Sequence, residues 1–348
     1  MTILAIEGFD LYNGTGTNTG IQARWSAINW FYGPQMAAGR FAGQGFMNGN
    51  GEGCATGLLF PTASGPGFGC CHAFRINSLA TVNNTNTGGI IGISAAAINT
   101  EQFSWRPRQD GSIVVYRNGV LLGQSATGVI VNNTFHYIEC WGILSATVGT
   151  INMKVDGVQV LTLSGLNNVA SATTVYGGIA FGGGIYGSSG GFPSNNVTID
   201  DMYFTDGNTL GERKIETLRP AADTTTKQFV ADTGTVNFSR VNATLAQSTT
   251  FVQGSNIGDT DLYTVGALAS TPAAIDAVNI ISFANKTDAA TRALALVADV
   301  STVQIVSPNL TLGASVGMNN SLMLTRPGGG AWTAADITAL KIGPKVAA

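Results

Sequence analysis

Hydrophobic and polar residues alternate with a period of two along most of the chain, and the spacing typical of amphipathic helices is almost absent. The clearest example is residues 151–163, where two alternating runs flank Asp156-Gly157. Asp-Gly is a preferred two-residue hairpin turn, because both of its positions adopt positive φ. The pattern therefore predicts a β-hairpin in which Met153 lies opposite Val160.

Two further segments follow the same pattern. Asn118-Gly119 joins two apolar runs and predicts a second hairpin. Residues 134–141 alternate strictly, which predicts a strand with different side chains on its two faces. One face carries Phe135, Tyr137, Glu139 and Trp141.

The chain changes character near residue 208. The densest cluster of charged residues lies within 212–219, and a polar run follows it. Polar segments with few apolar residues commonly join domains. We therefore predict a first domain at residues 1–210, a connector at 211–230 and a second domain at 231–348.

Strand patterns continue in the second domain, at residues 277–284 and 292–298. Thr333 could cap one short helix, residues 334–340, because its hydroxyl accepts a free backbone N–H. The chain as a whole is expected to be all-β.

Composition changes this picture in one respect. Charged residues make up only 11% of the 348 residues, against about 25% in a typical soluble domain. A surface with so little charge is expected to be covered in part by partner subunits. The net charge of −3 provides no basic excess for a phosphate backbone, so we expect no nucleic-acid partner.

Targeting and redox signals are also weak. Residues 1–7 lack a positive region and do not resemble a secretion signal, and the most apolar stretch, 88–98, is too short to span a bilayer. No membrane insertion is expected. The four cysteines are expected to be reduced and mostly buried, because Cys70 and Cys71 are neighbours that point to opposite faces of a strand.

Several segments resemble known proteins when taken in order. Five segments resemble the concanavalin A-like, laminin-G-like jelly roll: Phe103–Trp105, Asn118-Gly119, Phe135–Glu139, Lys154–Gly157 and Ile199–Asp206. Three later segments resemble the C-terminal half of virion proteins of tailed bacteriophages: residues 210–220, 261–263 and 331–337. The resemblance implies an N-terminal concanavalin A-like jelly-roll sandwich followed by a smaller C-terminal β-sandwich domain. It also implies a structural role on the virion exterior, as a tail appendage, a fibre or a capsid decoration.

Catalytic signatures are not evident, and we expect no enzyme. Jelly-roll glycosidases need two carboxylates flanking the scissile bond, which usually stand on one strand as Glu-x-Asp-x-x-Glu. That pattern does not occur, and Asp200 and Asp201 are adjacent and should face opposite ways. For Glu139 a structural hydrogen bond is the favoured role.

No cofactor is expected. His72 and His136 are the only histidines, and the spacings of a zinc site are missing. Asp200, Asp201 and Asp206 could offer oxygen ligands to calcium, although aspartates that cap turns are the commoner explanation.

The richest aromatic cluster contains Trp25, Trp30 and Tyr32. Aromatic faces can stack on sugar rings, but aromatic residues of strands usually fill a core or an interface. We favour the core or a subunit interface and keep a glycan platform as the alternative.

Two hypotheses for function follow. The first is a virion structural protein, made in the cytoplasm of the bacterial host, that acts through contacts with other virion proteins and with copies of itself. A trimer is the first guess, because the phage appendages that it resembles are commonly trimeric. The alternative is a receptor-binding module that recognises a glycan of the host surface.

Overall fold

The structure is a computed structural model, and it describes residues 1–12, 21, 24–30, 35–41, 43–47, 54–82, 91–94, 101–170, 173–182, 197–243 and 249–348. The chain forms two compact units, Met1–Ile215 and Glu216–Ala348. Helices are limited to a 3-10 turn, η3 (Leu79–Thr81), and two short α-helices, α1 (Phe238–Val241) and α2 (Ala334–Ala339). The prediction of an all-β chain is confirmed. Within the described residues, none of the helices has the length and apolar character needed to cross a membrane.

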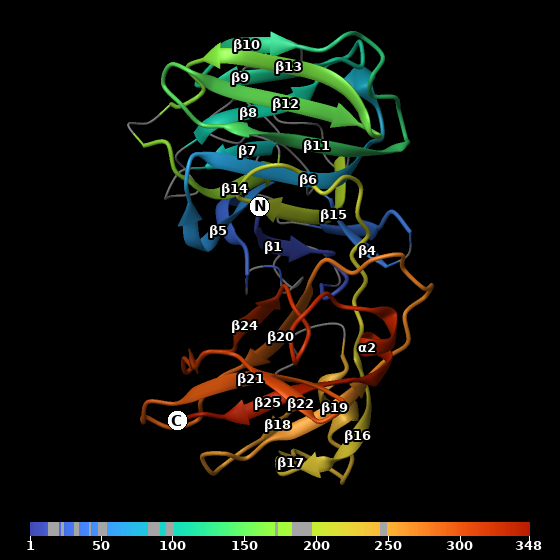
Figure 1. Ribbon diagram of the computed structural model, residues 1–348, viewed down its shortest axis with the longest axis vertical. Helices are drawn as coiled ribbons and strands as arrows, with labels where there is room; N and C mark the ends of the chain where they lie inside the picture. Colours follow the sequence, from blue (N-terminus) through green and yellow to red (C-terminus); the bar gives the residue numbers. More distant parts are fainter. Residues whose placement is uncertain are drawn as a thin grey trace. The chain divides into compact units, whose positions relative to one another are not determined.

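Two antiparallel sheets build the first unit (Figure 1). Sheet A has the order β13 (Val158–Leu166), β12 (Gly149–Val155), β11 (Phe135–Ile143), β6 (Gly67–Ile76), β15 (Val197–Thr205), β4 (Gln44–Met47), β3 (Gln35–Ala38), and β1 (Ile3–Glu7) also pairs with β15. Sheet B has the order β10 (Val120–Gln124), β9 (Ile113–Arg117), β8 (Glu101–Pro107), β7 (Ile91–Ser94), β14 (Tyr176–Gly182), β5 (Cys54–Ser64), β2 (Ser26–Trp30). The predicted jelly-roll sandwich is confirmed.

The core of this unit lies between the two sheets. Sheet A contributes Phe68 and Ile138, and sheet B contributes Phe103 and Trp105, all of them completely buried. Because successive side chains of a strand point to opposite faces, each sheet also has an outer face directed away from this core. Each large side chain buried in this way stabilises the fold by roughly 1.5–3 kcal/mol.

Both predicted hairpins are present. The turns Asn118-Gly119 and Asp156-Gly157 have positive φ at all four residues. The predicted register of the Asp156-Gly157 hairpin is wrong at one pair, because Met153 lies opposite Leu161 rather than Val160. A β-bulge between Met153 and Lys154 shifts the pairing by one residue and turns Leu161 toward the core.

The second unit is a smaller assembly of two layers. Its main sheet, sheet C, has the order β16 (Pro220–Lys227), β19 (Asp261–Val265), β25 (Leu340–Val346), β21 (Ala293–Val300), β22 (Val303–Val306), with β23 (Leu310–Thr311) also on β21. The ribbon of β20 (Val278–Ala284) and β24 (Gly317–Met323) packs on it through Ile280 and Met323. A second ribbon pairs β17 (Val230–Ala231) with β18 (Val252–Gln253).

Thr333 caps α2 as expected. Its hydroxyl accepts a hydrogen bond from the Asp336 N–H, and the Asp336 carboxylate accepts one from the Thr333 N–H, so a capping box is formed.

The predicted connector, 211–230, is largely built into the two units. Residues 220–227 form β16, an edge strand of sheet C that pairs with β19. Residues 208–215 lie on sheet A, as described below. A polar sequence resembles a linker, yet an edge strand tolerates the same polarity because one of its sides faces water.

The described thiols are free and buried, as expected for Cys70, Cys71 and Cys140. The side chain of Cys54, in β5, lies outside the described residues.

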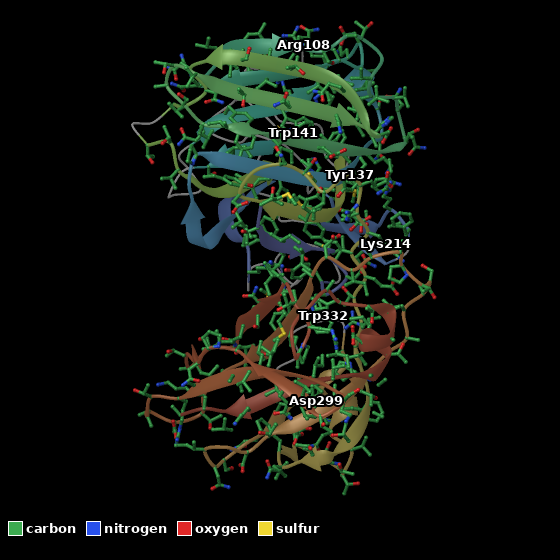
Figure 2. All side chains as sticks on the ribbon, in the orientation of Figure 1. Arg108, Tyr137, Trp141, Lys214, Asp299 and Trp332 are labelled. Carbon is green, nitrogen blue, oxygen red and sulfur yellow. The ribbon has the colours of Figure 1, made fainter. Side chains whose placement is uncertain are left out.

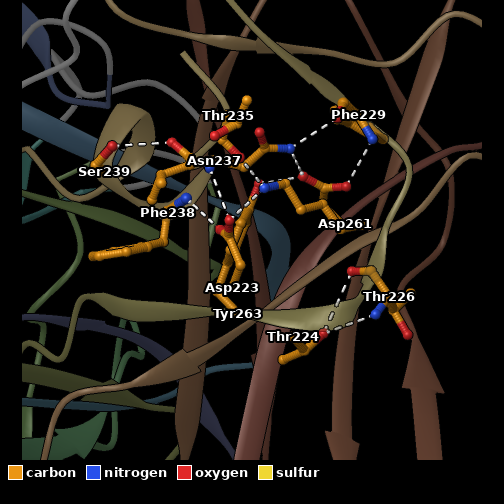
Figure 3. A network of polar contacts seen from close by, with 12 residues as sticks. Asp223, Thr224, Thr226, Phe229, Thr235, Asn237, Phe238, Ser239, Asp261 and Tyr263 are labelled. Atoms are coloured by element: carbon orange, nitrogen blue, oxygen red, sulfur yellow. Dashed lines mark hydrogen bonds and ion pairs between the residues drawn. The ribbon is translucent and has the colours of Figure 1, made fainter.

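A network of polar groups organises the second unit (Figure 3). Asp261 accepts hydrogen bonds from the backbone N–H groups of Gln228 (2.6 Å) and Phe229 (2.7 Å). It also accepts from Asn237 Nδ2 (2.6 Å) and from the Tyr263 hydroxyl (2.8 Å). Both oxygens of this buried carboxylate are therefore satisfied.

Candidate functional site

The outer face of sheet A carries a partly exposed tryptophan. Trp141 lies on β11, on the same face as Tyr137, where the sequence placed it (Figure 2). Its cross-strand partner on β12 is Asn152, whose own partner on β13 is Thr162. Cross-strand partners point to the same side of a sheet, so an indole, an amide and a hydroxyl stand in one row. We call this row, with the adjacent Lys154, the Trp141 face.

Lys154 gives the Trp141 face its charge. Its ammonium group lies 5.5 Å from the centroid of the Trp141 ring, a cation–π distance. In the register of the sheet Lys154 stands opposite Glu139, but none of the ion pairs found among the described residues includes Lys154. The ammonium therefore remains available to an additional partner.

A segment that we call the strap, residues 208–215, borders this face. The Leu210 N–H donates to the Tyr203 hydroxyl (2.7 Å), which in turn donates to the Gly211 carbonyl (2.8 Å). Gly69, the partner of Trp141 on β6, permits the close approach, because a Cβ there would lie 3.2 Å from the carbonyl oxygen of Asn208. The start of the strap thus forms a wall beside the indole.

Glu139 has a structural partner. Its carboxylate accepts a hydrogen bond from the Thr209 hydroxyl at 2.5 Å and so fastens the strap to sheet A. This is the role that the sequence favoured for Glu139.

Asp200 and Asp201 lie at a bulge in β15 and do not face opposite ways, contrary to the prediction. Asp201 has a positive φ of 48°, and the register against β6 shifts between Asp200 and Tyr203. Asp200 accepts from the Arg40 N–H (2.7 Å), and Asp201 Oδ2 lies 3.9 Å from Arg40 Nη1. The local kink of the bulge brings both carboxylates to one arginine.

Burial raises the pKa values of both Asp200 and Asp201. Burial and, to a smaller extent, the charge of the neighbouring Asp201 together raise the pKa of Asp200 to about 7. Burial also raises the pKa of Asp201 to about 6, although a hydrogen bond from the Ile215 N–H and the charge of Arg40 act in the opposite direction. Arg40 also pairs with Glu212 of the strap.

The three aspartates considered for calcium are not gathered into a site. Asp206 lies apart and accepts a hydrogen bond from the Thr2 N–H (2.6 Å), while Asp200 and Asp201 hold backbone N–H groups near Arg40. Across the part of the chain that the structure describes, no group of three or more His, Cys, Asp or Glu side chains is arranged to hold a metal ion.

The aromatic cluster of the N-terminal region is divided. Trp25 is 1% exposed; its ring lies 4.6 Å from that of Phe181, and its indole N–H donates to Glu7 (3.1 Å). It belongs to the core and offers no platform to a sugar. Trp30 ends β2 opposite Cys54, and Tyr32 lies outside the described residues.

Comparison with known proteins gives no family. No protein-family model and no curated protein match the chain. Among solved structures, the alginate lyase Aly36B is similar over 61% of this chain and 98% of its own, with 12% identity and a TM-score of 0.39. The carbohydrate recognition domain of Emp46p is similar over 60% and 97%, with 10% identity and a TM-score of 0.35. A pentraxin from Limulus polyphemus is similar over 44% and 70%, with 16% identity and a TM-score of 0.31.

One expectation is corrected by this comparison. The sequence led us to expect no enzyme, but the first of the similar structures is a lyase. We therefore withdraw the expectation that the chain is no enzyme. At these identities and TM-scores the likeness concerns the fold alone.

Proposed function

We propose that this chain is an exterior structural protein of a tailed-phage virion whose jelly-roll unit binds a glycan of the host surface at the Trp141 face. The observation that carries the glycan part is the row of Trp141, Asn152 and Thr162 on the outer face of sheet A. A partly exposed indole can lie flat against a sugar ring, while amide and hydroxyl groups hydrogen-bond to its hydroxyls. The virion part rests on the resemblance of the sequence to phage proteins.

A glycan array tests the binding function. The intact chain is expected to bind a small set of glycans, and Trp141→Ala is expected to abolish that binding. Val158→Ala is the matched control, because Val158 is 66% exposed on β13 and is not part of the row. No selective binding across a broad array would contradict the proposal.

Lys154 sharpens the same experiment. Lys154→Met keeps the apolar stem and removes the positive charge. If the glycan is acidic, binding weakens and its salt dependence decreases. If the glycan is neutral, the variant binds as the original chain does.

Assembly without glycan binding is the second candidate, and exposed apolar residues on edge strands favour it. On β10, Val120 and Leu121 are about half exposed, and on β22, Val303 and Val306 are similarly open. Edge strands of this kind are suited to pairing or packing with neighbouring copies. Light scattering at micromolar concentration tests self-association, with the mass of a trimer as the expected result. A constant mass near 35.9 kDa would contradict it.

The location in the particle needs a separate measurement. Negative-stain microscopy of virions labelled with an antibody against this chain is expected to mark the exterior. Label that is absent from intact particles and present in infected-cell lysate would contradict the virion proposal.

A further inference from the structure

The outer face of sheet B contains a buried arginine. On β8, Phe103 and Trp105 belong to the core, so Ser104 and Arg106 point the other way. Tyr116 of β9 is the cross-strand partner of Ser104 and shares this outer face. Arg106 is only 2% exposed, although it does not point into the core.

No negative charge accompanies Arg106. Among the ion pairs formed by the described residues, none includes this guanidinium, and its Nε and Nη2 atoms have no hydrogen-bond partner. Of the 20 acidic residues in the sequence, only Glu52 lies outside the described residues. A buried charge is costly unless an opposite charge or hydrogen bonds accompany it.

The two unpartnered nitrogen atoms lie on one edge of the guanidinium plane. Nε–H and Nη2–H point in parallel, and their separation matches the two oxygens of a carboxylate. Such forked contacts distinguish arginine from lysine, which offers a single point charge. The missing partner of Arg106 is therefore best matched by a planar anion with two oxygens.

The surroundings of Arg106 suit such an anion. The guanidinium carbon lies 5.5 Å from the centroid of the Tyr116 ring, and Arg108 Nη2 donates to the Tyr116 hydroxyl at 2.8 Å. Two cations thus contact Tyr116, Arg106 at its ring and Arg108 at its hydroxyl. Burial lowers the pKa of Arg106, which reflects the cost of its charge when it is alone.

The floor next to this group is made of small residues. Ser104 pairs with Gly92 on β7, and Gly92 pairs with Ala180 on β14. Beginning beside Tyr116, the row on the outer face therefore consists of the hydroxyl of Ser104, Gly92, which has no side chain, and the methyl group of Ala180. These residues are buried, and the sheet itself places no large side chain along this row.

Glu101 is the nearest acid along the strand. Burial raises its pKa to about 7, and the Ser104 hydroxyl acts in the opposite direction. Below that pH the group is a neutral carboxylic acid, so it does not repel an anion held by Arg106.

We infer that the outer face of sheet B binds an organic carboxylate, of the kind carried by a uronic acid, through Nε and Nη2 of Arg106. This site is separate from the Trp141 face, which lies on the other sheet, and the inference does not depend on glycan binding there. Burial favours a carboxylate over phosphate, because a second negative charge would add to the cost of desolvation.

Titration of the intact chain at pH 6 tests the inference. Sodium glucuronate is expected to raise the melting temperature in a saturable way, whereas glucose at the same concentration has no effect. Arg106→Lys keeps the charge and loses the fork, so binding is expected to weaken at least about tenfold. Arg117→Met is the matched control on the neighbouring strand and should leave binding unchanged, because Arg117 already donates to the Asn167 carbonyl.

Three outcomes would overturn the inference. One is the absence of any saturable response to glucuronate in the original chain. Another is an equal or stronger response to inorganic phosphate or sulfate, which would change the ligand class. The third is undiminished binding by Arg106→Lys. If that variant fails to fold, the Nε–H proton of Arg106 in the original chain can be followed by NMR, and it must shift on addition of glucuronate.

Discussion

Asp261 in the second unit and the pair Asp200 and Asp201 in the first unit are all almost inaccessible to water, yet their surroundings differ. Asp261 accepts four hydrogen bonds. Asp201 accepts one from the Ile215 N–H, leaves Oδ2 without a hydrogen-bond partner, and lies beside Asp200. Burial alone therefore does not decide whether a carboxylate stabilises this fold.

Asp223 makes the same point through its pKa. Burial acts to raise it, but hydrogen bonds from Lys227 and from the N–H groups of Phe238 and Asn237 hold the pKa below its ordinary value (Figure 3). Fewer donors reach Asp200 and Asp201 in the first unit, and the pKa values of these two acids rise. The number of donors that reach a carboxylate decides the sign.

The largest effect is expected from Asp261→Ala. Removal of the carboxylate leaves three buried donors without that acceptor: the Phe229 N–H, one N–H of the Asn237 amide and the Tyr263 hydroxyl. Each such group costs about 1–3 kcal/mol, so we expect the second unit to lose roughly 4 kcal/mol or more. Denaturant unfolding of the intact chain measures this loss. A loss below about 1 kcal/mol would remove the contrast between the two units.

The pH dependence of the first unit comes next. Asp200 and Asp201 have pKa values of about 7 and 6 in the folded chain, above the value of about 3.8 expected when unfolded. Groups with a raised pKa contribute stability below the unfolded pKa and lose it as pH rises through the folded pKa. We expect the first unit to lose roughly 2–4 kcal/mol between pH 4 and pH 8.

Asp223 should behave in the opposite sense. Its lowered pKa gives stability that is present above pH 4 and is lost as pH falls through the folded pKa. Unfolding curves at several pH values, followed by tryptophan fluorescence, distinguish the units, because only Trp332 of the five tryptophans lies in the second. Parallel pH profiles for the two transitions would contradict the comparison.

A smaller effect is expected from Asp201→Asn. The amide keeps an oxygen for the Ile215 N–H and removes a charge that the site accommodates poorly. At pH 8 the first unit should gain about 1–2 kcal/mol, and at pH 4 it should change little. Asp223→Asn is the matched control and should destabilise at pH 8. A loss of stability from both variants at pH 8 would show that Arg40 compensates the charge of Asp201 fully.

The smallest effect is expected from Asp288→Ala. This carboxylate forms an ion pair with Arg292 at 2.6 Å, but both side chains are exposed. Exposed pairs contribute little because water and salt screen them. The unfolding midpoint should not move measurably in 0.15 M salt, and a clear shift would assign a structural role to this surface pair.

Much of the fold could be predicted from local sequence. Asn118-Gly119 and Asp156-Gly157 mark their hairpins, since few other dipeptides accept positive φ twice. Thr333 and Asp336 mark the start of α2. The bulge near Met153 was missed, because an added residue in a strand leaves the alternation of apolar residues nearly unchanged.

The candidate sites depended on contacts that the sequence does not display. The alternation of residues 134–141 placed Trp141 on the correct face, and the hairpin register placed Lys154 near Glu139. Whether a strap or water covers that face is decided by residues 208–215, far along the chain. The sequence does not predict that Arg106 lacks an acidic partner. This depends on where all the acidic residues lie in three dimensions, and a local sequence pattern contains no such information.

The pairing of β1 with β15 affects how the chain folds as it is synthesised. Ile3 lies opposite Thr205, so the first strand must wait until about two hundred further residues have left the ribosome. Contacts of such high sequence separation slow folding, because the entropy of closing the long loop is lost before the contacts that stabilise it can form. Until then β1 and the edge of β6 that pairs with β15 remain open to other chains, and a crowded nascent protein can pair wrongly. The first unit is therefore expected to fold late and as a whole, with β1 the last strand to be secured.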